Sequence, residues 1–186
     1  MKLTLGSASP RRLEILRQAN IVPEKITPAD IDEKPKVREL PLHYCERIAL
    51  EKANSICINE NEIILTADTT VAVGRRILGK PNNAEEAIKF LKLLSGRRHK
   101  VITTIAARNI NAIRKKSVIT EVRFNRLSMS DINCYIESEE WKGKAGGYAI
   151  QGLGAEFIPW ISGSYSGVVG LPIAQTIILL KSMGWK

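Results

Sequence analysis

Two long segments rich in β-branched residues place the strongest constraint on the fold of this chain. Residues 99–107 and 113–124 both alternate apolar and polar side chains, and the polar stretch 109–111 separates them. Alternation with a period of two is typical of strands that bury one face, and a short polar connection between two such strands predicts a hairpin. The sheet must therefore contain a long antiparallel ribbon, which excludes an all-helical chain.

The other segments alternate between strand-like and helix-like patterns. Strands are predicted near Leu3 and Leu5, at 62–67, and in a hairpin over 71–78 that turns near Gly74. The predicted helices are one that starts at Pro10, then 42–58, 84–94, a short helix from a Ser130 cap to Glu139, and 172–183. We expect residues 1–186 to form a single α/β domain, in which helices flank a mixed, strongly twisted sheet.

The composition is that of a folded globular protein with a surplus of basic residues. Hydrophobic residues make up 44% of the 186 residues and charged residues 25%, and the net charge is +9. The surplus suggests an anionic partner. Because the lysines and arginines are scattered and aromatic residues are only 5%, nucleic acid is the weaker alternative and a phosphorylated small molecule the stronger one.

Cysteine and hydropathy patterns indicate a protein of the cytoplasm. Cys45, Cys57 and Cys134 are isolated, and only His43 and His99 could join them in a metal site, so we expect neither disulfides nor structural zinc. The cysteines are instead expected in the core. No apolar run approaches the length of a membrane span, and the N-terminus lacks the apolar centre of a signal peptide, so no membrane association is expected.

The N-terminal segment places two arginines where a helix is least favourable to positive charge. Ser9 and Pro10 are typical of a helix N-cap and first position, so Arg11 and Arg12 fall in the first turn. Because the helix dipole favours anions there, the arginines, the exposed amides and the hydroxyls of Ser7 and Ser9 predict a phosphate site. The alternative is that both arginines are solvated. The segment lacks the P-loop pattern, so ordinary ATPase or kinase chemistry is not implied.

Asp68 follows a predicted apolar strand, at the place where open α/β sheets hold their ligands. A free aspartate with a pKa of about 3.9 is a weak base at neutral pH. Proton abstraction by Asp68 therefore needs a raised pKa or a metal ion that acidifies water, and the sequence favours the metal. The alternative is that Asp68 only caps the turn after its strand.

Two glycine-rich segments, 143–152 and 163–172, would let the backbone approach a ligand closely, and their amides could recognise phosphate or a base edge. Glycine content alone is weak support for a site. Lys52, in the helix that precedes the Asp68 strand, and Lys80 could add cations to the same groove. Either lysine could equally be a solvated surface residue.

Six motifs together closely resemble the Maf family of nucleoside triphosphate pyrophosphatases. They are SASPRR at 7–12, ADT at 67–69, GKP at 79–81, SGRRH at 95–99, GKAGGYAIQG at 143–152 and VVGLP at 168–172. Each motif is modest, but they stand in the family order and span nearly the whole chain. The resemblance implies an elongated, two-lobed fold with a central groove, similar to inosine triphosphatases and often dimeric. It also implies hydrolysis between the α and β phosphates with Mg²⁺ or Mn²⁺.

The resemblance also implies roles for particular residues. Asp68 resembles the catalytic proton acceptor and Glu33 the acidic partner that helps to hold the metal ion. Arg12, Lys52 and Lys80 resemble the cations that bind the triphosphate, and both lysines are expected to assist catalysis. These implied roles place the chemistry of the groove on five charged side chains from separate parts of the chain.

Three residues match the branch of the family that acts on dTTP and UTP. They are Arg11, Thr69 and Gln151, whereas the branch that acts on 7-methyl-GTP typically has Ser-Asp-Gln in place of Ala-Asp-Thr. The amide of Gln151 offers both a donor and an acceptor, which suits the O4 and N3–H edge of uracil or thymine. Two positions depart from the family: Gly6 replaces an alanine, which should cost at most about 1 kcal/mol, and Gly167 replaces a frequent asparagine.

Two alternatives of other kinds stay open. The chain could be a regulator that binds nucleotides or nucleic acid in the groove without turnover, which the charge of +9 supports. Such a nucleic-acid binder should lose affinity steeply with added salt. The chain could also be a house-cleaning pyrophosphatase for inosine-type purine nucleotides. Thr69 and Gln151 argue against purines, although only through the resemblance.

Overall fold

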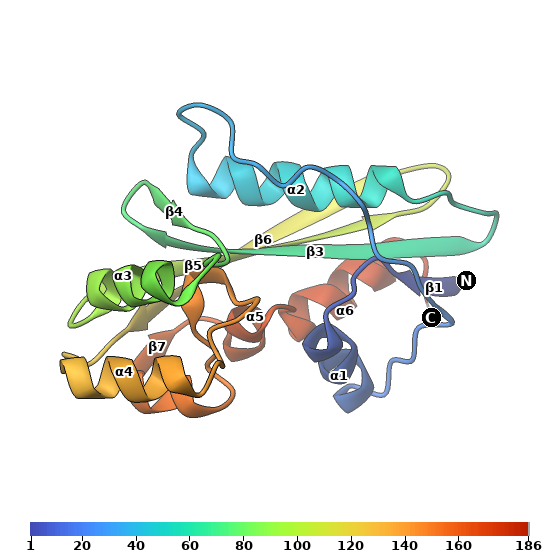
Figure 1. The fold of residues 1–186 in the computed structure, drawn as a ribbon. Helices are drawn as coiled ribbons and strands as arrows, with labels where there is room; N and C mark the ends of the chain where they lie inside the picture. Colours follow the sequence, from blue (N-terminus) through green and yellow to red (C-terminus); the bar gives the residue numbers. More distant parts are fainter. Residues whose placement is uncertain (186) are drawn as a thin grey trace.

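One mixed sheet of seven strands organises residues 1–185, which are the residues described in the computed structural model (Figure 1). The strands are β1 (Lys2–Leu5), β2 (Lys25–Ile26), β3 (Glu62–Val73), β4 (Arg76–Leu78), β5 (Arg98–Arg108), β6 (Ile113–Arg123) and β7 (Trp160–Ser162). Their order is β2-β1-β3-β5-β6-β7, with β4 paired to β3. β1 is parallel to both of its neighbours and the remaining pairs are antiparallel, so the predicted mixed α/β sheet is confirmed.

The long strands β3, β5 and β6 form the spine of the sheet. β5 and β6 pair without interruption from Arg98 opposite Arg123 to Arg108 opposite Ile113, which confirms the predicted antiparallel ribbon. At the turn, the side chain of Asn109 accepts hydrogen bonds from two backbone amides that follow it. A short polar turn therefore fixes the register of the longest strand pair in the chain.

β3 differs from its prediction, because the strand does not end before Asp68 but continues to Val73. Pairing with β5 over the whole middle of β3 keeps this segment extended. The other edge of β3 changes partner: β1 pairs with it up to Leu65, and β4 pairs with it from Val71 onward. Among the described residues no strand covers this edge from Thr66 to Thr70. Asp68 therefore lies at a gap in the sheet edge rather than at a strand end.

Helices cover the two faces of the sheet unequally. They are α1 (Pro10–Gln18), α2 (Pro41–Ser55), α3 (Ala84–Leu94), α4 (Met129–Glu137), α5 (Tyr165–Val169) and α6 (Ile173–Ser182), with two short 3₁₀ segments, Ala145–Gly147 and Leu153–Phe157. α2 lies alone along one face, and the other helices lie on the opposite side (Figure 1). Within residues 1–185, α2 is therefore the only helix that covers the face that carries Asp68.

The apolar core is divided into two main clusters, which correspond to the predicted lobes. One cluster joins α1 and α6 to β1, and the other joins α3 and α4 to the opposite half of the long strands. The fully buried centres of these clusters include Leu5, Leu16 and Leu180 in the first, and Leu91, Leu94 and Phe124 in the second. Two adjacent cores on one continuous sheet leave room for a groove between them.

Two further local predictions were wrong, namely the N-cap of α4 and the burial of all three cysteines. α4 starts at Met129 with Ser128 as its N-cap, not Ser130, because Ser128 and Asp131 form a capping box. Cys57 and Cys134 are exposed, and only Cys45 is buried, so the cysteines do not share a core position.

Within residues 1–185 no helix is both long enough and apolar enough to cross a membrane.

Candidate active site

A groove of about 1210 Å³ lies beside the uncovered edge of β3. Its volume is ample for a nucleotide-sized ligand. The groove brings together every side chain that the sequence predicts for the site: Ser7, Ser9, Arg11, Arg12, Glu33, Lys52, Asp68, Thr69, Lys80 and Gln151. These residues come from α1, α2, β3 and four connecting segments, so their meeting depends on the whole fold.

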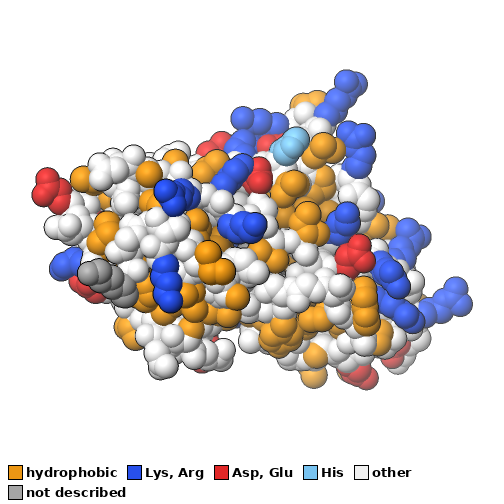
Figure 2. Space-filling view, turned by 180° about the vertical axis from the view of Figure 1, so that it is seen from behind, with side chains coloured by type: hydrophobic (Ala, Val, Ile, Leu, Met, Phe, Trp, Pro, Cys, Tyr) orange, Lys and Arg blue, Asp and Glu red, His pale blue; other side chains and the backbone are white. Residues whose placement is uncertain are grey.

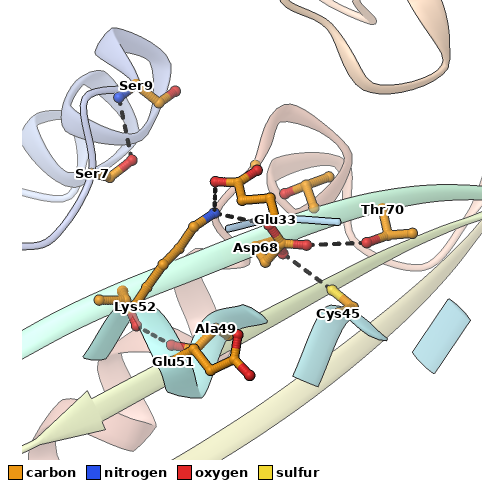
Figure 3. Close-up of polar contacts among 12 residues, drawn as sticks. Ser7, Ser9, Glu33, Cys45, Ala49, Glu51, Lys52, Asp68 and Thr70 are labelled. Atoms are coloured by element: carbon orange, nitrogen blue, oxygen red, sulfur yellow. Dashed lines mark hydrogen bonds and ion pairs between the residues drawn. The ribbon is translucent and has the colours of Figure 1, made fainter. Parts of the chain in front are cut away.

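An ion triad of Asp68, Lys52 and Glu33 occupies one end of the groove (Figure 3). Lys52 lies on the buried stripe of α2, and its Nζ is 3.0 Å from Oδ1 of Asp68 and 2.8 Å from Oε1 of Glu33. The side chains of Lys52 and Asp68 are only 10% and 8% exposed, whereas Glu33 is 40% exposed. Two carboxylates thus converge on one cationic position that is largely withdrawn from water.

The neighbours of Asp68 hold its carboxylate and its backbone in place. The hydroxyl of Thr70 donates to Oδ2 of Asp68 at 3.1 Å, and the thiol of Cys45 lies 3.4 Å from its carbonyl oxygen. Burial, reinforced by the negative charge of Asp68, raises the pKa of Cys45 to about 12. Because a protonated thiol is a poor nucleophile, Cys45 serves here as a packing group and donor.

Arg12 joins three segments at the centre of the groove. Its Nε donates to the carbonyl oxygen of Gly170 at 2.9 Å, one terminal nitrogen donates to Ser7 Oγ at 2.9 Å, and the other lies 3.4 Å from Thr69 Oγ1. Burial lowers the pKa of Arg12, and the charge of Asp68 acts in the opposite direction. The guanidinium has five N–H groups and stays charged at neutral pH. Two N–H groups therefore stay available to a bound anion.

The N-terminus of α1 has the features that the sequence predicts for a phosphate site. Ser9 is the N-cap with Pro10 following it, but its side chain makes no capping hydrogen bond, and the first turn holds no acidic residue. The amide of Ser9 instead donates to Ser7 Oγ at 3.2 Å. The first-turn amides and two arginines thus face the groove without a fixed negative partner of their own helix.

A second group of lining residues consists of Arg11, Glu140, Lys144, Tyr148 and Gln151, and among these Lys144 lies near the charges of Arg11 and Glu140. Partial burial lowers the pKa of Arg11, and burial together with the charge of Arg11 lowers the pKa of Lys144. Gln151 is exposed and lies in a loop between two short 3₁₀ segments. This group therefore offers cations and a free amide, with an aromatic wall formed by Tyr148.

The loop that carries Glu33 is held by α2. Tyr44 donates from its hydroxyl to the carbonyl oxygen of Glu33 at 2.8 Å, and Arg47 bonds both carboxylate oxygens of Glu39 at 2.7 Å. Lys80 is 63% exposed and its Nζ lies 4.0 Å from Oε2 of Glu33, so it borders the ion triad without being part of its buried centre.

Several contact residues were missed by the sequence interpretation. Thr70 and Tyr44 support Asp68 and Glu33, and Glu140 and Tyr148 belong to the second group of lining residues. Thr70 directly follows the ADT motif, and Tyr148 lies inside the long glycine-rich motif, so their positions in the motifs could have identified both as site residues. Tyr44 and Glu140 carried no such signal, because their roles are hydrogen bonds to distant backbone atoms.

The carboxylates fit a divalent ion that takes some of its ligands from the protein and others from a substrate. Asp68 and Glu33 offer oxygen ligands to one cationic position, which Lys52 fills. In residues 1–185 no cluster of three or more His, Cys, Asp and Glu side chains could hold a metal ion by itself. Mg²⁺ commonly binds one or two protein carboxylates and takes its other ligands from water and phosphates. The two carboxylates are thus suited to such a shared site.

Comparison with known proteins identifies the family of this chain. A family model described as Maf-like protein matches residues 2–183. A protein of Cereibacter sphaeroides named dTTP/UTP pyrophosphatase is 54% identical over 99% of this chain and 96% of its own length, and one of Roseobacter denitrificans with that name is 56% identical over 98% and 97%. The solved Staphylococcus aureus Ham1 protein is 12% identical, covering 67% of this chain and 72% of its own, with a TM-score of 0.46. The match over nearly the whole sequence shows that this chain belongs to the Maf family.

Proposed function

We propose that this protein is a nucleoside triphosphate pyrophosphatase that hydrolyses dTTP and UTP to the nucleoside monophosphate and pyrophosphate. The observation that carries the proposal is the convergence of Asp68 and Glu33 on Lys52, in a groove also lined by Arg12 and Lys80. Relatives named dTTP/UTP pyrophosphatase, which are about as long as this chain, support the choice of substrate.

The reaction uses Asp68 as the proton acceptor for water. As the water oxygen bonds to the α phosphorus, its proton passes to the Asp68 carboxylate and the bond from the α phosphorus to the α–β bridging oxygen breaks. Negative charge then accumulates on the departing pyrophosphate. Arg12, Lys52 and Lys80 offset this charge, because all three cations line the same groove.

Lys52 changes partners in this scheme. In the structure its ammonium group balances Asp68 and Glu33, and both contacts are short. A bound triphosphate offers Lys52 a new anionic partner, and Asp68 and Glu33 would then be the residues that hold Mg²⁺ or Mn²⁺. The divalent ion supplies Lewis acidity toward the phosphates when it is bound.

The base is selected by Arg11 and Gln151, together with Thr69 beside Asp68. Gln151 is exposed and offers an amide to O4 and N3–H of uracil or thymine. Thr69 shares its hydroxyl with Arg12 and Thr103, so it links the base end to the phosphate end. Ser7 and Ser9 contribute at the phosphate end, where Ser7 also orients Arg12.

The nucleic-acid alternative has little support on the face of the molecule that Figure 2 shows. Figure 2 shows basic side chains at several separate places on one face, with hydrophobic and uncharged atoms between them. A protein that follows a nucleic-acid backbone needs a continuous basic track. The charge of the groove itself suits a compact polyphosphate better.

One panel of nucleotides tests the proposal. The purified protein is given dTTP, UTP, CTP, ITP or 7-methyl-GTP with Mg²⁺ or Mn²⁺, and pyrophosphate release is measured. We expect turnover of dTTP and UTP, and none without a divalent ion. Turnover of ITP or 7-methyl-GTP alone would transfer the chain to a purine function. Salt-sensitive binding of nucleic acid without any turnover would make it a regulator.

Three further points stay predictions: action of the whole chain as a single domain, assembly into a homodimer and location in the cytoplasm. The two core clusters that share one continuous sheet support the single domain. Light scattering of the purified protein measures its oligomeric state directly.

A further inference from the structure

The loop that presents Gln151 is built around the carboxylate of Glu140. Oε2 of Glu140 accepts a hydrogen bond of 2.9 Å from the amide of Leu153, and Oε1 accepts one of 3.1 Å from the amide of Gly154. These two amides open a 3₁₀ segment that has no side-chain cap of its own. Glu140 therefore caps a segment that lies more than ten residues further along the chain.

The same carboxylate also reaches the other side of Gln151. The hydroxyl of Tyr135 donates to Oε1 of Glu140 at 3.2 Å and accepts a hydrogen bond of 3.3 Å from the amide of Ala149. The chain is thus fixed two residues before Gln151 through Tyr135, and again shortly after Gln151 by Glu140 directly. A single carboxylate anchors both flanks of the exposed amide.

Two glycines show how closely the loop is folded around this anchor. Gly152 has φ of 123°, and a Cβ there would lie 2.4 Å from Oε2 of Glu140. A Cβ on Gly154 would lie 2.4 Å from the carbonyl oxygen of Ala149. Both contacts are far below a normal separation, so only glycine permits the backbone to close on the carboxylate.

We propose that Glu140 is a positioning residue for base selection, which acts by fixing the backbone from which Gln151 projects. The inference rests on the proposed function, because it takes Gln151 as the group that meets the base. A glutamine on a loose loop can place its amide at many positions relative to a base, so it discriminates poorly between uracil and cytosine. A fixed loop holds the point from which the side chain projects, so that the amide can meet O4 and N3–H of uracil.

Glu140→Gln is the decisive variant. It keeps the size of the side chain but sets an amide donor against one of two backbone N–H groups. We expect the KM for UTP to rise about tenfold, because the loop loses roughly one of the hydrogen bonds that position Gln151. The kcat should stay within about twofold. The preference for UTP over CTP, measured as the ratio of kcat/KM values, should fall about tenfold. Glu137→Gln, an exposed acid on α4, is the matched control and should change neither quantity.

A double-mutant cycle distinguishes positioning from general support. In a Gln151→Ala background, Glu140→Gln should cause no further loss of the UTP preference, because its effect passes through Gln151. A merely structural role would instead lower the kcat/KM for UTP and CTP equally and independently of Gln151. Tyr135→Phe removes the hydroxyl that joins Ala149 to Glu140 but leaves the hydrogen bonds from Leu153 and Gly154 to Glu140, so it should lower the same preference by a smaller factor.

The outcomes are separable from those of the proposed function. If folded Glu140→Gln keeps the wild-type preference for UTP, or if its effect adds fully to that of Gln151→Ala, the inference is overturned. Should Glu140→Gln fail to fold, an unchanged preference in Tyr135→Phe overturns it instead. Absence of dTTP and UTP turnover in the wild-type protein defeats the proposed function itself.

Discussion

The two ends of the groove are organised by different means. At the phosphate end, Lys52 and Asp68 project from α2 and β3, and these charged side chains hold one another. At the base end, Gln151 projects from a loop whose backbone is held by Glu140. The phosphate end thus uses charges that a ligand can re-pair, whereas the base end uses fixed contacts that no ligand needs to break.

This difference suits the two tasks. Hydrolysis of the α–β phosphoanhydride moves negative charge onto the departing pyrophosphate, and cations that already line the groove can offset it. Recognition of a base requires a donor and an acceptor in fixed positions, and loops gain such precision only from a supporting framework.

Substitution of the proton acceptor should have the largest effect. Asp68→Asn keeps a polar side chain in contact with Lys52 and Thr70, so the fold should persist while kcat falls about 1000-fold. Pyrophosphate release measures the loss, and circular dichroism checks the fold. Asp30→Asn, an exposed acid in the loop before Glu33, is the control. Near-normal turnover by Asp68→Asn would remove Asp68 from its proposed role.

Acid should weaken the base end first. His99 is buried behind Tyr148, with Nε2 2.7 Å from its hydroxyl, and burial lowers the pKa of His99 from 6.5 to about 4. The unfolded chain binds this proton more readily, so the contribution of neutral His99 is complete above pH 6.5 and is lost as the pH falls toward 4. The loss amounts to roughly 3 kcal/mol of unfolding free energy.

Urea unfolding across this pH range tests the assignment. The pH-dependent loss should largely disappear in His99→Gln, which keeps a polar partner for Tyr148. Glu39, in the loop that carries Glu33, provides the contrast, because its hydrogen bonds to Arg47 lower its pKa from 4.5 to about 2. The stability it supplies is complete above pH 4.5 and falls only below that value. An equal acid response in His99→Gln and wild type would contradict this order of events.

Removal of the central cation should destabilise the phosphate end in a metal-dependent way. Lys52→Met leaves Asp68 and Glu33 facing each other, which should cost about 2 kcal/mol, less than a fully buried pair because Glu33 is partly exposed. Mg²⁺ should recover part of this loss in the variant and stabilise the wild type less. Equal stabilisation of both proteins by Mg²⁺ would argue against a shared cationic position.

Much of this architecture could be predicted from the sequence, because it follows from local periodicity. The β5–β6 ribbon, the hairpin near Gly74 and the helix α3 all carry clear alternation or helical spacing. The continuation of β3 through Asp68 could not be predicted, since pairing with β5 decides it and β5 comes much later in the chain. The short elements β2, β7 and α5 have too few residues for a periodic pattern.

The site was predictable where its residues lie in motifs and unpredictable where it depends on contacts. Lys52 was identified as a cation, but only the fold reveals that it lies between Asp68 and Glu33. The departure at Gly6 also gains a physical meaning, because a Cβ there would lie 2.6 Å from Thr66 Cγ2. The glycine is therefore a packing requirement in this chain rather than only a looser loop.

Lys80 should give the smallest effect on stability and thereby sharpen the contrast with Lys52. Its side chain is 63% exposed and 4.0 Å from Glu33, and exposed ion pairs contribute less than about 1 kcal/mol. Lys80→Met should therefore leave the unfolding free energy nearly unchanged, with or without Mg²⁺, while raising the KM for UTP severalfold through loss of a phosphate partner. Urea unfolding and steady-state kinetics on Lys80→Met and Lys52→Met give a matched pair. If both variants are destabilised equally, burial of the ion triad does not set the stability of this end, because an exposed lysine and a buried one would then contribute alike.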